Sequence, residues 1–480
     1  MSEPPVLLWF RRDLRLDDQP ALAAAVASGR PVLPLYVLPD PRCPNAASYE
    51  TSDLGAASRW WLHHSLTALA REIGAHGGRL ILRHGCDIPE TVAALARELG
   101  AVAVYWGRDD LAPEHIDMSL QQKLAGVGIG AHRFNTTRLF TPGSILTNSG
   151  TPYKVFTPFW RACRAVPPPP EPKPAPARIR FYRGETLASD DLDSARLLPV
   201  KPDWAGGLRA SWVPGTSSAR DRLAQFIAAH LRGYASERDR PDHPGSSFLS
   251  PHLHFGEISP RQIWHAVHHA ARIHSCERDS DVFLAELGWR EFARELLIVH
   301  PDMAQTPMRS EYRGFPWHRD RKLQQRWRQG RTGVPIVDAG MRQLWQTGWM
   351  HNRVRMIVAS FFVKHLLQPW QDGADWFLDT LVDADLANNA TNWQWVAGCG
   401  VDATPFFRIF NPVTQARKFD PKGDYIRRWV PELAHLDAPA IHEPTARAYM
   451  EPMVDLSEAR QRCLQTYEQF KTAPPIEADE

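Results

Sequence analysis

The spacing of apolar residues changes once along this chain of 480 residues, and that change restricts the folds it can adopt. Over residues 1–134, short apolar runs alternate with amphipathic segments. From about residue 206 onward, apolar residues recur at helical spacing and no strand pattern interrupts them. Alternating strands and helices build a parallel sheet with helices on both faces, whereas uninterrupted helical spacing builds an all-α domain. The sequence therefore predicts an α/β doubly wound parallel-sheet domain followed by a large all-α domain.

Four parallel strands are expected in the first domain. They are Val6–Phe10, Pro31–Val37, Leu80–Arg83 and Val102–Trp106. The helices between them are expected to end near Ser28, Ile73 and Leu99, and each of these residues precedes a glycine. Glycine commonly ends a helix because it adopts the left-handed conformation without steric cost. The second of these helices is expected to begin at Asp53.

A nicotinamide dinucleotide site is not expected in the first domain. No G-x-G-x-x-G sequence follows the first strand. The glycines of Gly126–Ala131 have a similar spacing, but this segment leads into a possible strand, whereas the dinucleotide motif opens a helix. We interpret Gly126–Ala131 as a turn.

Residues 135–205 are expected to connect the two domains. Proline recurs through Pro167–Pro176, which favours a stiff, extended segment without a core of its own. The third part, residues 206–480, is long enough to enclose a cofactor between helices. Its expected helices are Ala219–Arg232, Pro260–Ile273, Asp281–His300, Pro335–Gln346, Arg353–Leu367 and Trp376–Val382.

Charge alone indicates no polyanionic partner, because the formal net charge is only +2. Between Glu286 and Arg355, however, thirteen lysines and arginines stand against seven acidic residues, with aromatic residues among them. This pattern is compatible with nucleic acid, although solvated arginine-rich helices give the same count. No apolar run has the length of a membrane span, and the N-terminus lacks the features of a signal peptide.

The six cysteines are scattered along the chain and include no C-x-x-C pair. They are Cys43, Cys86, Cys163, Cys276, Cys399 and Cys463. This distribution favours a reducing, cytoplasmic location, and it argues against a structural zinc site or a disulfide framework. No metal site is expected.

The most unusual stretch is Asp383–Trp395, which combines acids, amides and two tryptophans within thirteen residues. Asparagine and aspartate favour helix ends and turns, since their side chains bond to the local backbone. Such a stretch can present polar groups to a ligand, or it can be a polar loop above a core that contains tryptophan. The residues by themselves leave both interpretations open.

Three motifs together resemble the DNA photolyase/cryptochrome family. They are Asp383–Trp395 with the following Arg408–Pro412, then Gly348–Met356, and finally Leu8–Leu16. The motifs occur in the order in which the family has them, and the resemblance covers nearly the whole chain. It implies that the sheet domain carries a light-harvesting antenna chromophore and that the helical domain holds FAD without a covalent bond.

The activity implied by this resemblance is light-driven repair of cyclobutane pyrimidine dimers in ultraviolet-damaged DNA. An electron from light-excited, two-electron-reduced FAD would pass to a dimer flipped out of the duplex and then return. Asn352 and Met356 stand where repair enzymes for the (6-4) photoproduct have catalytic histidine. The alternatives are a cryptochrome-type blue-light photoreceptor and, with less support, (6-4) repair or a light-independent flavin electron-transfer protein. We expect a monomer.

The resemblance assigns one set of residues to FAD: Tyr234, Ser246, Ser247, Leu249, Ser250, Glu286, Arg290, Asn352, Arg355, Asp383, Asp385 and Asn389. The segment from Ser246 to Ser250 would hold the diphosphate, and Arg355 would pair with Asp383 over the flavin. Asn389 aligns with the residue beside flavin N5, where an amide can accept a hydrogen bond. Phe248 stands where the family usually has arginine, so one charged contact is lost.

A second set of residues is assigned to the lesion and its DNA: Glu286, Trp289, Asn352, Arg353 and Trp395. Glu286, Trp289 and Arg290 are three and four residues apart, so on a helix they share one face. Glu286 would bond the pyrimidine edge, and Trp289 and Trp395 would form aromatic walls, as expected for a site that binds an extruded base. The residues expected to act during repair are Glu286, Asn352, Met356 and Asn389.

Three tryptophans align with the electron relay of the family: Trp317, Trp370 and Trp393. Indole is one of the few side chains that can be oxidised to a usable radical, so a series of indoles can carry electrons from the surface to a flavin. The three residues are far apart in sequence, so no spacing argument links them. Without the resemblance, each would be interpreted as a core residue.

The antenna is the least defined part of the resemblance. Glu114 aligns with an acid that contacts folate in some family members. The Cys-Lys pair that helps to hold folate in those members is absent, and Met303–Gln305 stands in its place. The antenna is therefore expected to be methenyltetrahydrofolate or a deazaflavin, and Glu114 is equally interpretable as a surface acid.

Overall fold

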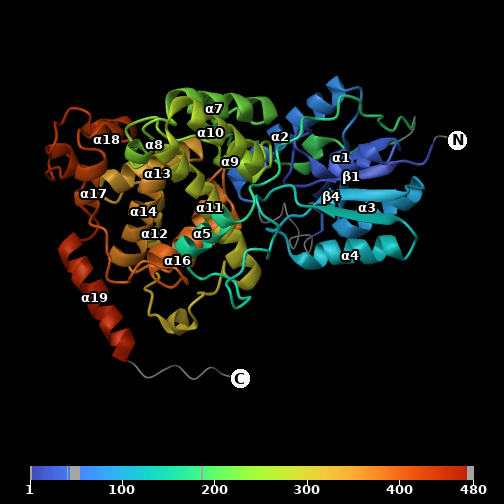
Figure 1. Cartoon of the computed structure of the whole chain (residues 1–480). Coiled ribbons are helices and arrows are strands. Elements are labelled where there is room, and N and C mark those ends of the chain that lie inside the picture. Colours follow the sequence, from blue (N-terminus) through green and yellow to red (C-terminus); the bar gives the residue numbers. More distant parts are fainter. Residues whose placement is uncertain (1–2, 41, 44–53, 185–186, 473–480) are drawn as a thin grey trace.

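The protein consists of a sheet domain and a helical domain joined by a long connector (Figure 1). The computed structural model describes residues 3–40, 42–43, 54–184 and 187–472. The N-terminus lies at the outer end of the sheet domain, and the last helix, α19 (Leu456–Thr472), lies at the opposite end of the molecule. Among the described residues, no helix is both long and apolar enough to span a membrane.

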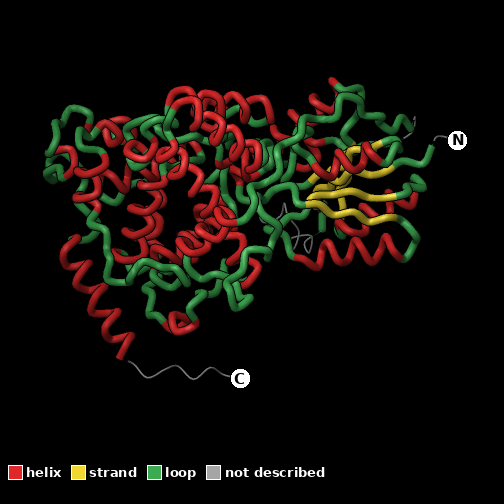
Figure 2. Tube along the Cα trace, in the orientation of Figure 1, coloured by secondary structure: helices red, strands yellow, loops and turns green. Residues whose placement is uncertain are grey.

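The sheet has five strands in the order β3-β2-β1-β4-β5, all parallel, and appears in yellow in Figure 2. The strands are β1 (Val6–Phe10), β2 (Val32–Pro39), β3 (Ile81–Gly85), β4 (Ala103–Gly107) and β5 (Gly130–Phe134). The first four are the expected strands, and β5 is the possible strand that follows the turn at Gly126. The predicted α/β sheet domain is therefore confirmed.

Helices cover both faces of this sheet, as a doubly wound fold requires. They are α1 (Pro20–Ala27), α2 (Ala56–Ala75), α3 (Ile88–Glu98) and α4 (Glu114–Ala125). Leu8 of β1 packs in a core with α1 and α2, whereas the neighbouring Leu7 packs in a second core with α3 and α4. Adjacent side chains of a strand point to opposite faces, which explains why the strand is buried throughout. Asp53, the expected start of α2, lies outside the described residues.

The second domain is helical, as predicted. Its elements are α6 (Gly206–Ser211), α7 (Thr216–Ala229), α8 (Tyr234–Glu237), α9 (Ser250–His254), α10 (Pro260–His274), α11 (Glu277–Val299), α12 (Arg321–Arg328), α13 (Pro335–Thr347), α14 (Asn352–Ser360), α15 (Trp370–Thr380), α16 (Leu386–Ala397), α17 (Pro412–Phe419) and α18 (Asp424–Trp429), followed by α19. The expected helix Arg353–Leu367 corresponds to α14 with a π-helical turn, Phe361–His365, after it.

The connector is more ordered than its sequence indicates, because it contains helix α5 (Phe156–Ala165). A Cβ atom on Gly288 of α11 would lie only 2.4 Å from the ring of Trp160, so α5 packs tightly on α11. The proline-rich run after α5 has no helix or strand, as expected.

The two domains meet closely at the end of α9. Arg15, after the first strand, donates a hydrogen bond of 2.9 Å to the carbonyl of Gly256, and the backbone N–H of Leu14 donates to the carbonyl of Phe255 at 3.1 Å. Gly256 has a φ of 67°, and a Cβ atom there would lie 2.1 Å from the carbonyl oxygen of Arg12. Only glycine fits this contact, so the end of α9 is held directly by the sheet domain.

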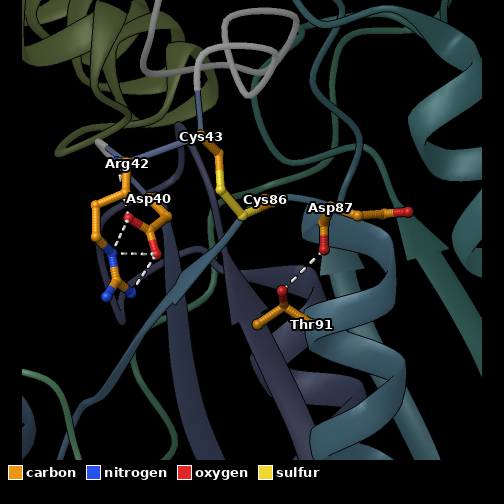
Figure 3. The surroundings of a disulfide bond; sticks show 6 residues. All are labelled: Asp40, Arg42, Cys43, Cys86, Asp87 and Thr91. Carbon is orange, nitrogen blue, oxygen red and sulfur yellow. Dashed lines mark hydrogen bonds and ion pairs between the residues drawn. A yellow bond between two sulfur atoms is a disulfide. The ribbon is translucent and has the colours of Figure 1, made fainter.

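One expectation about the cysteines is wrong: the structure has a disulfide between Cys43 and Cys86, with a Cα–Cα distance of 5.6 Å (Figure 3). Cys43 follows β2 and Cys86 follows β3, which are neighbours in the sheet, so a pairing across 43 residues depends on strand order. A carboxylate oxygen of Asp40 lies within 4.8 Å of both sulfur atoms, and Arg42 donates to this carboxylate at 2.9 Å. The other four cysteines are free and buried.

Candidate functional site

The helical domain encloses a cavity of about 520 Å³, here named the central cavity. It is lined by helices α8, α9, α11, α14, α15 and α16 and by the segments that precede α9 and α16. A volume of this size lies within the range of roughly 300–1,000 Å³ that is usual for cofactor and ligand sites. The position between packed helices is where bundles usually hold cofactors.

The central cavity brings together nearly all of the residues that the sequence assigned to a cofactor and a lesion. Those that line it are Tyr234, Ser246, Ser247, Leu249, Ser250, Glu286, Trp289, Arg290, Asn352, Arg353, Arg355, Met356, Asp383, Asp385, Asn389, Trp393 and Trp395. Trp317, Trp370 and Glu114 are not among its lining residues. The lining residues come from segments up to 162 positions apart in the chain, from Tyr234 to Val396, so the fold makes the site.

An ion pair holds the wall formed by α14 and the segment before α16. The guanidinium of Arg355 donates to both carboxylate oxygens of Asp383, at 3.0 and 2.8 Å. Ser250, the first residue of α9, donates its hydroxyl to the same carboxylate at 2.7 Å. Only 4% of the Asp383 side chain is exposed, compared with 25% of Arg355. The pair joins three elements and places one charge of each sign beside the cavity.

Asp385 caps the N-terminus of α16 and forms an ion pair with an arginine. Its carboxylate accepts a hydrogen bond of 2.9 Å from the backbone N–H of Asn388, which caps the helix. Arg294 of α11 donates to the same carboxylate at 2.9 Å. Burial alone would raise the pKa of Asp385, but Arg294 and Arg290 lower it more, and it lies well below its usual value. The carboxylate is therefore ionised near neutral pH.

Sequence reasoning did not identify Arg294, although a signal was present. Arg294 lies four residues after Arg290, so the two share one face of α11. Arg290 donates to the carbonyl of Thr137 at 2.8 Å, and Arg294 donates to the Thr137 hydroxyl at 3.3 Å. Burial lowers the pKa of Arg290 to about 9. The spacing from Arg290 could have marked Arg294 as a second arginine at the site.

A second ion pair lies at the part of the cavity assigned to the lesion. Glu286 of α11 accepts from Arg238 at 2.7 Å, and about a third of the Glu286 side chain is exposed. Burial raises the pKa of Glu286, although Arg238 opposes this shift. Arg353 pairs with Asp239 at 2.8 Å. Sequence reasoning also missed Arg238 and Asp239, which follow Tyr234 at the spacing of one helical turn.

Aromatic rings also line the part of the cavity assigned to the lesion. The ring of Trp289 stacks on Phe156, the first residue of α5, with centroids 3.7 Å apart and an interplanar angle of 11°. Trp395 also lines the cavity and is partly buried. Stacking on Phe156 fixes the plane of the Trp289 indole before any ligand arrives.

Asn389 of α16 has a fixed amide orientation. Its Nδ2 group donates to the carbonyl of Ala374 in α15 at 3.0 Å. The amide oxygen of Asn389 is then the atom left to accept a hydrogen bond, because the amide of asparagine carries a single oxygen acceptor. This orientation agrees with the role assigned to Asn389 beside a flavin.

The three tryptophans assigned to an electron relay belong to one hydrophobic core of the helical domain or pack against it. Trp393 lines the cavity, and its ring packs on Gly373, where a Cβ atom would lie 2.2 Å away. Gly373 is one turn along α15 from the buried Trp370. Trp317 precedes His318, whose backbone N–H donates to the carbonyl of Leu367 at 2.7 Å, just before α15. Trp393 and Trp370 are buried and Trp317 is partly buried, so Trp317 is the most exposed of the three.

Phe248 occupies an apolar position in the segment assigned to the diphosphate. Its backbone has a φ of 54°, and its ring packs against Trp349 with centroids 4.6 Å apart. The guanidinium of Arg222 lies 5.9 Å from the Phe248 ring centroid and 4.8 Å from that of Trp212. Aromatic packing therefore replaces the charged contact that the family usually has at this position.

Glu114 belongs to a surface ion-pair group on the sheet domain. Its carboxylate accepts from Arg133 at 2.7 Å and lies 3.7 Å from Arg108. Half of the Glu114 side chain is exposed. Its assignment to an antenna stays a prediction, and the surface interpretation accounts for its contacts.

The polar groups of the central cavity fit a cofactor of the size and polarity of FAD. Nη2 of Arg290 and Oγ1 of Thr391 are buried without a hydrogen-bond partner among the described residues. Buried polar atoms are nearly always paired in folded proteins, so such atoms on a cavity wall indicate a polar ligand. Serine hydroxyls, a paired carboxylate and an oriented amide add acceptors and donors around the same space.

Two sequence models cover most of this chain. One, described as the FAD binding domain of DNA photolyase, matches residues 283–469, and the other, described as DNA photolyase, matches residues 6–177. The chain is 45% identical to the deoxyribodipyrimidine photo-lyase of Agrobacterium fabrum, across 98% of this chain and 99% of that protein. It is 36% identical to cryptochrome-1 of Arabidopsis thaliana, across 95% of this chain and 69% of that protein.

The fold is also shared with a solved structure. The crystal structure of a bacterial class III photolyase from Agrobacterium tumefaciens superposes with a TM-score of 0.93 and 44% sequence identity. The matched region covers 98% of this chain and 99% of that chain. Both domains are therefore present in that structure in the same arrangement.

Proposed function

We propose that this chain, which belongs to the DNA photolyase family, is a light-driven enzyme that splits cyclobutane pyrimidine dimers in DNA. It is a flavoprotein whose helical domain binds FAD. FAD, when bound in its two-electron-reduced form, supplies the electron that light sends to the dimer and takes it back after the ring has opened. The observation that carries the proposal is that residues assigned to the cofactor and to the lesion line one cavity.

The protein's first task is to hold a charged cofactor in a dry site. Arg355 and Asp383 place a cation and an anion beside it, and the Ser250 hydroxyl holds the carboxylate in position. The amide oxygen of Asn389 accepts a hydrogen bond without titrating near neutral pH. A carboxyl or thiol group at this position could exchange a proton, whereas the amide of Asn389 cannot. This favours a flavin kept reduced for repair.

The second task is to bind the dimer next to the cofactor. Trp289, already stacked on Phe156, offers its other face to an extruded base, and Trp395 forms a second wall. Glu286 meets the pyrimidine edge from α11, and burial raises its pKa, so the fraction that is protonated and can donate a hydrogen bond is larger than in a free glutamate. Binding of this kind orients the dimer and excludes water from it.

The site contains no free imidazole at the position where (6-4) repair would need one. Asn352 and Met356 line the cavity, whereas His351 caps α14 by accepting from the backbone N–H of Arg353 at 3.1 Å. Burial lowers the pKa of His351 to about 4, so its ring stays neutral near pH 7. A neutral imidazole with one nitrogen engaged is a poor proton donor, which favours the cyclobutane dimer as substrate.

DNA is the partner, and its binding should depend on arginines near the cavity. Arg238 and Arg353 line the cavity and are the best placed to meet phosphates beside a flipped dimer. Contacts of this type weaken steeply as salt rises, because binding releases counterions from the DNA. A monomer and a cytoplasmic location stay predictions, for which gel filtration and cell fractionation are the direct tests.

The test is a repair assay with two lesions. Photoreduced protein would be given oligonucleotides that carry either one cyclobutane thymine dimer or one (6-4) photoproduct, under blue light and in the dark. We expect light-dependent loss of the cyclobutane dimer alone, measured by chromatography of the oligonucleotides. Repair of only the (6-4) lesion would overturn the substrate, and photoreduction of FAD without repair of either lesion would indicate a photoreceptor.

A further inference from the structure

The last residue of α9, His254, lies on the wall of the central cavity but was assigned no role by sequence. Only 3% of its surface is exposed. Neither ring nitrogen has a hydrogen-bond partner among the residues that the structure describes. A buried polar atom without a partner destabilises a fold by roughly 1–3 kcal/mol, so two on one ring call for an explanation.

His254 is neutral in this environment. Burial, together with the nearby Arg12 and Arg294, lowers its pKa to about 3, although Asp385 opposes this shift. A neutral imidazole carries one N–H donor and one nitrogen acceptor. Both are therefore available to a ligand across the whole neutral range of pH.

His252, in the same helix, has a structural role that differs from that of His254. Nδ1 of His252 contacts the carboxylate of Glu257, which also accepts from the indole N–H of Trp61 at 3.1 Å. His252 is fully buried and is not among the lining residues of the cavity. Two residues apart on a helix, the rings point to nearly opposite sides, so only His254 faces the cavity.

We propose that His254 is a cofactor-binding residue, whose imidazole hydrogen-bonds a polar group of the bound FAD. The inference rests on the proposed FAD-binding function and adds a contact to it. The sheet domain holds the backbone beside His254 in place, because the two residues after His254 are bonded to the loop that follows β1. This segment is therefore already ordered before FAD binds, so binding costs no free energy for ordering it.

The test compares three variants of the FAD-loaded enzyme. His254→Phe keeps an aromatic ring but removes both nitrogens, and His254→Gln keeps a donor and an acceptor. His269→Phe is the matched control, because His269 lies on α10 and is exposed. The dissociation constant of FAD would be measured by equilibrium dialysis in the dark without DNA, and the unfolding midpoint would be measured at saturating FAD.

For His254→Phe we expect FAD to bind at least about tenfold more weakly than to the unmodified protein, which corresponds to about 1.4 kcal/mol. His254→Gln should lose less affinity than His254→Phe, and His269→Phe should bind as the unmodified protein does. The unfolding midpoints at saturating FAD should differ by no more than the weaker binding of FAD accounts for, since the packing is kept.

Two results would overturn the proposal. If His254→Phe keeps the original affinity, a water molecule satisfies the ring and FAD does not. If both substitutions at His254 weaken binding equally and lower the unfolding midpoint at saturating FAD by more than the weaker binding accounts for, the ring acts only in packing. Because the assay contains neither light nor DNA, a failure of repair would not change either outcome.

Discussion

Glu114 in the sheet domain and Glu286 in the helical domain are both acids that pair with arginine, but their surroundings differ. Glu114 is half exposed and meets Arg133 on the surface of α4 and β5. Glu286 lies on the wall of a cavity, where burial raises its pKa despite its partner Arg238. An exposed ion pair is screened by water and contributes little free energy to folding. A carboxyl group on a cavity wall keeps an altered pKa, which a bound ligand can use.

The same contrast separates the two regions as a whole. Around Glu114 the charges pair with one another, and Arg133 also meets the buried Asp117, while around the central cavity several buried polar atoms have no partner within the described part of the chain. A resemblance to one family suggested roles for residues in both regions. The surroundings distinguish them, because the unpaired atoms on the wall of the central cavity line a space of about 520 Å³, whereas half of the Glu114 side chain faces solvent.

The largest effect should come from breaking the ion pair on the cavity wall. In Arg355→Ala, the nearly buried Asp383 loses its cation, and we expect a loss of about 2 kcal/mol of folding free energy together with the loss of bound FAD. This figure is lower than for a fully buried pair because a quarter of Arg355 is exposed. Urea unfolding and the ratio of flavin to protein absorbance measure both effects.

Arg319→Ala is the matched control for that substitution. Arg319 also pairs with an aspartate, Asp372, at 2.8 Å, but 64% of its side chain is exposed. Its removal should change stability by less than about 1 kcal/mol and leave FAD bound. Equal effects of the two substitutions would contradict the distinction between the cavity and the surface.

A second prediction concerns electron supply to the cavity. Trp393→Phe removes the tryptophan assigned to the relay that lines the central cavity. Photoreduction of oxidised FAD should then slow by about an order of magnitude, whereas repair by chemically reduced protein should remain. Trp327→Phe is the control, because Trp327 is buried with its ring centroid 6.3 Å from that of Trp393 and has no assigned role. Absorbance of the flavin under blue light measures the rate. Equal slowing in both variants would place the relay elsewhere.

A smaller effect is expected from pH. The pKa of Glu286 is raised by burial, so its protonated fraction is larger than that of a free glutamate and grows as pH falls. If the protonated carboxyl donates to the dimer, binding of a dimer-containing oligonucleotide should tighten as pH falls toward the raised pKa of Glu286. Glu286→Gln should show a flatter dependence, as measured by fluorescence anisotropy. A Glu286→Gln curve parallel to that of the unmodified protein would remove Glu286 from this role.

The smallest effect is expected at the other acid of the comparison. Glu114→Ala should change folding free energy by less than about 1 kcal/mol and leave FAD content and dimer repair unchanged, because half of the Glu114 side chain is exposed. Reconstitution with methenyltetrahydrofolate, followed by its absorbance after dialysis, tests the antenna role directly. A loss of folate in Glu114→Ala alone would make Glu114 part of a chromophore site.

The sequence could predict the fold class because the apolar spacing changes at one place and because the strands are continuous apolar runs. It also identified residues such as Asp383 and Asn389, which the fold places around one cavity. These residues were identified because they belong to motifs shared with a known family. Residue spacing alone did not assign them a role. Their individual roles stay predictions.

What the sequence could not provide depends on elements that meet only in three dimensions. The disulfide of Cys43 and Cys86 follows from β2 and β3 being neighbours, which no cysteine spacing reveals. Arg294 reaches Asp385 across 91 positions, and its role appears only when α11 and α16 pack together. His254 stands out only after its unpaired nitrogens are seen on a cavity wall.

The most direct test of the account joins cofactor content to repair in one sample series. Protein would be prepared with increasing amounts of bound FAD, photoreduced, and given an oligonucleotide with one cyclobutane dimer under light and in the dark. We predict that repair in light rises in proportion to bound FAD, reaches its maximum at one FAD per chain, and is absent in the dark. Intact dimers in the fully loaded, photoreduced, illuminated protein would contradict the claim that the central cavity repairs DNA.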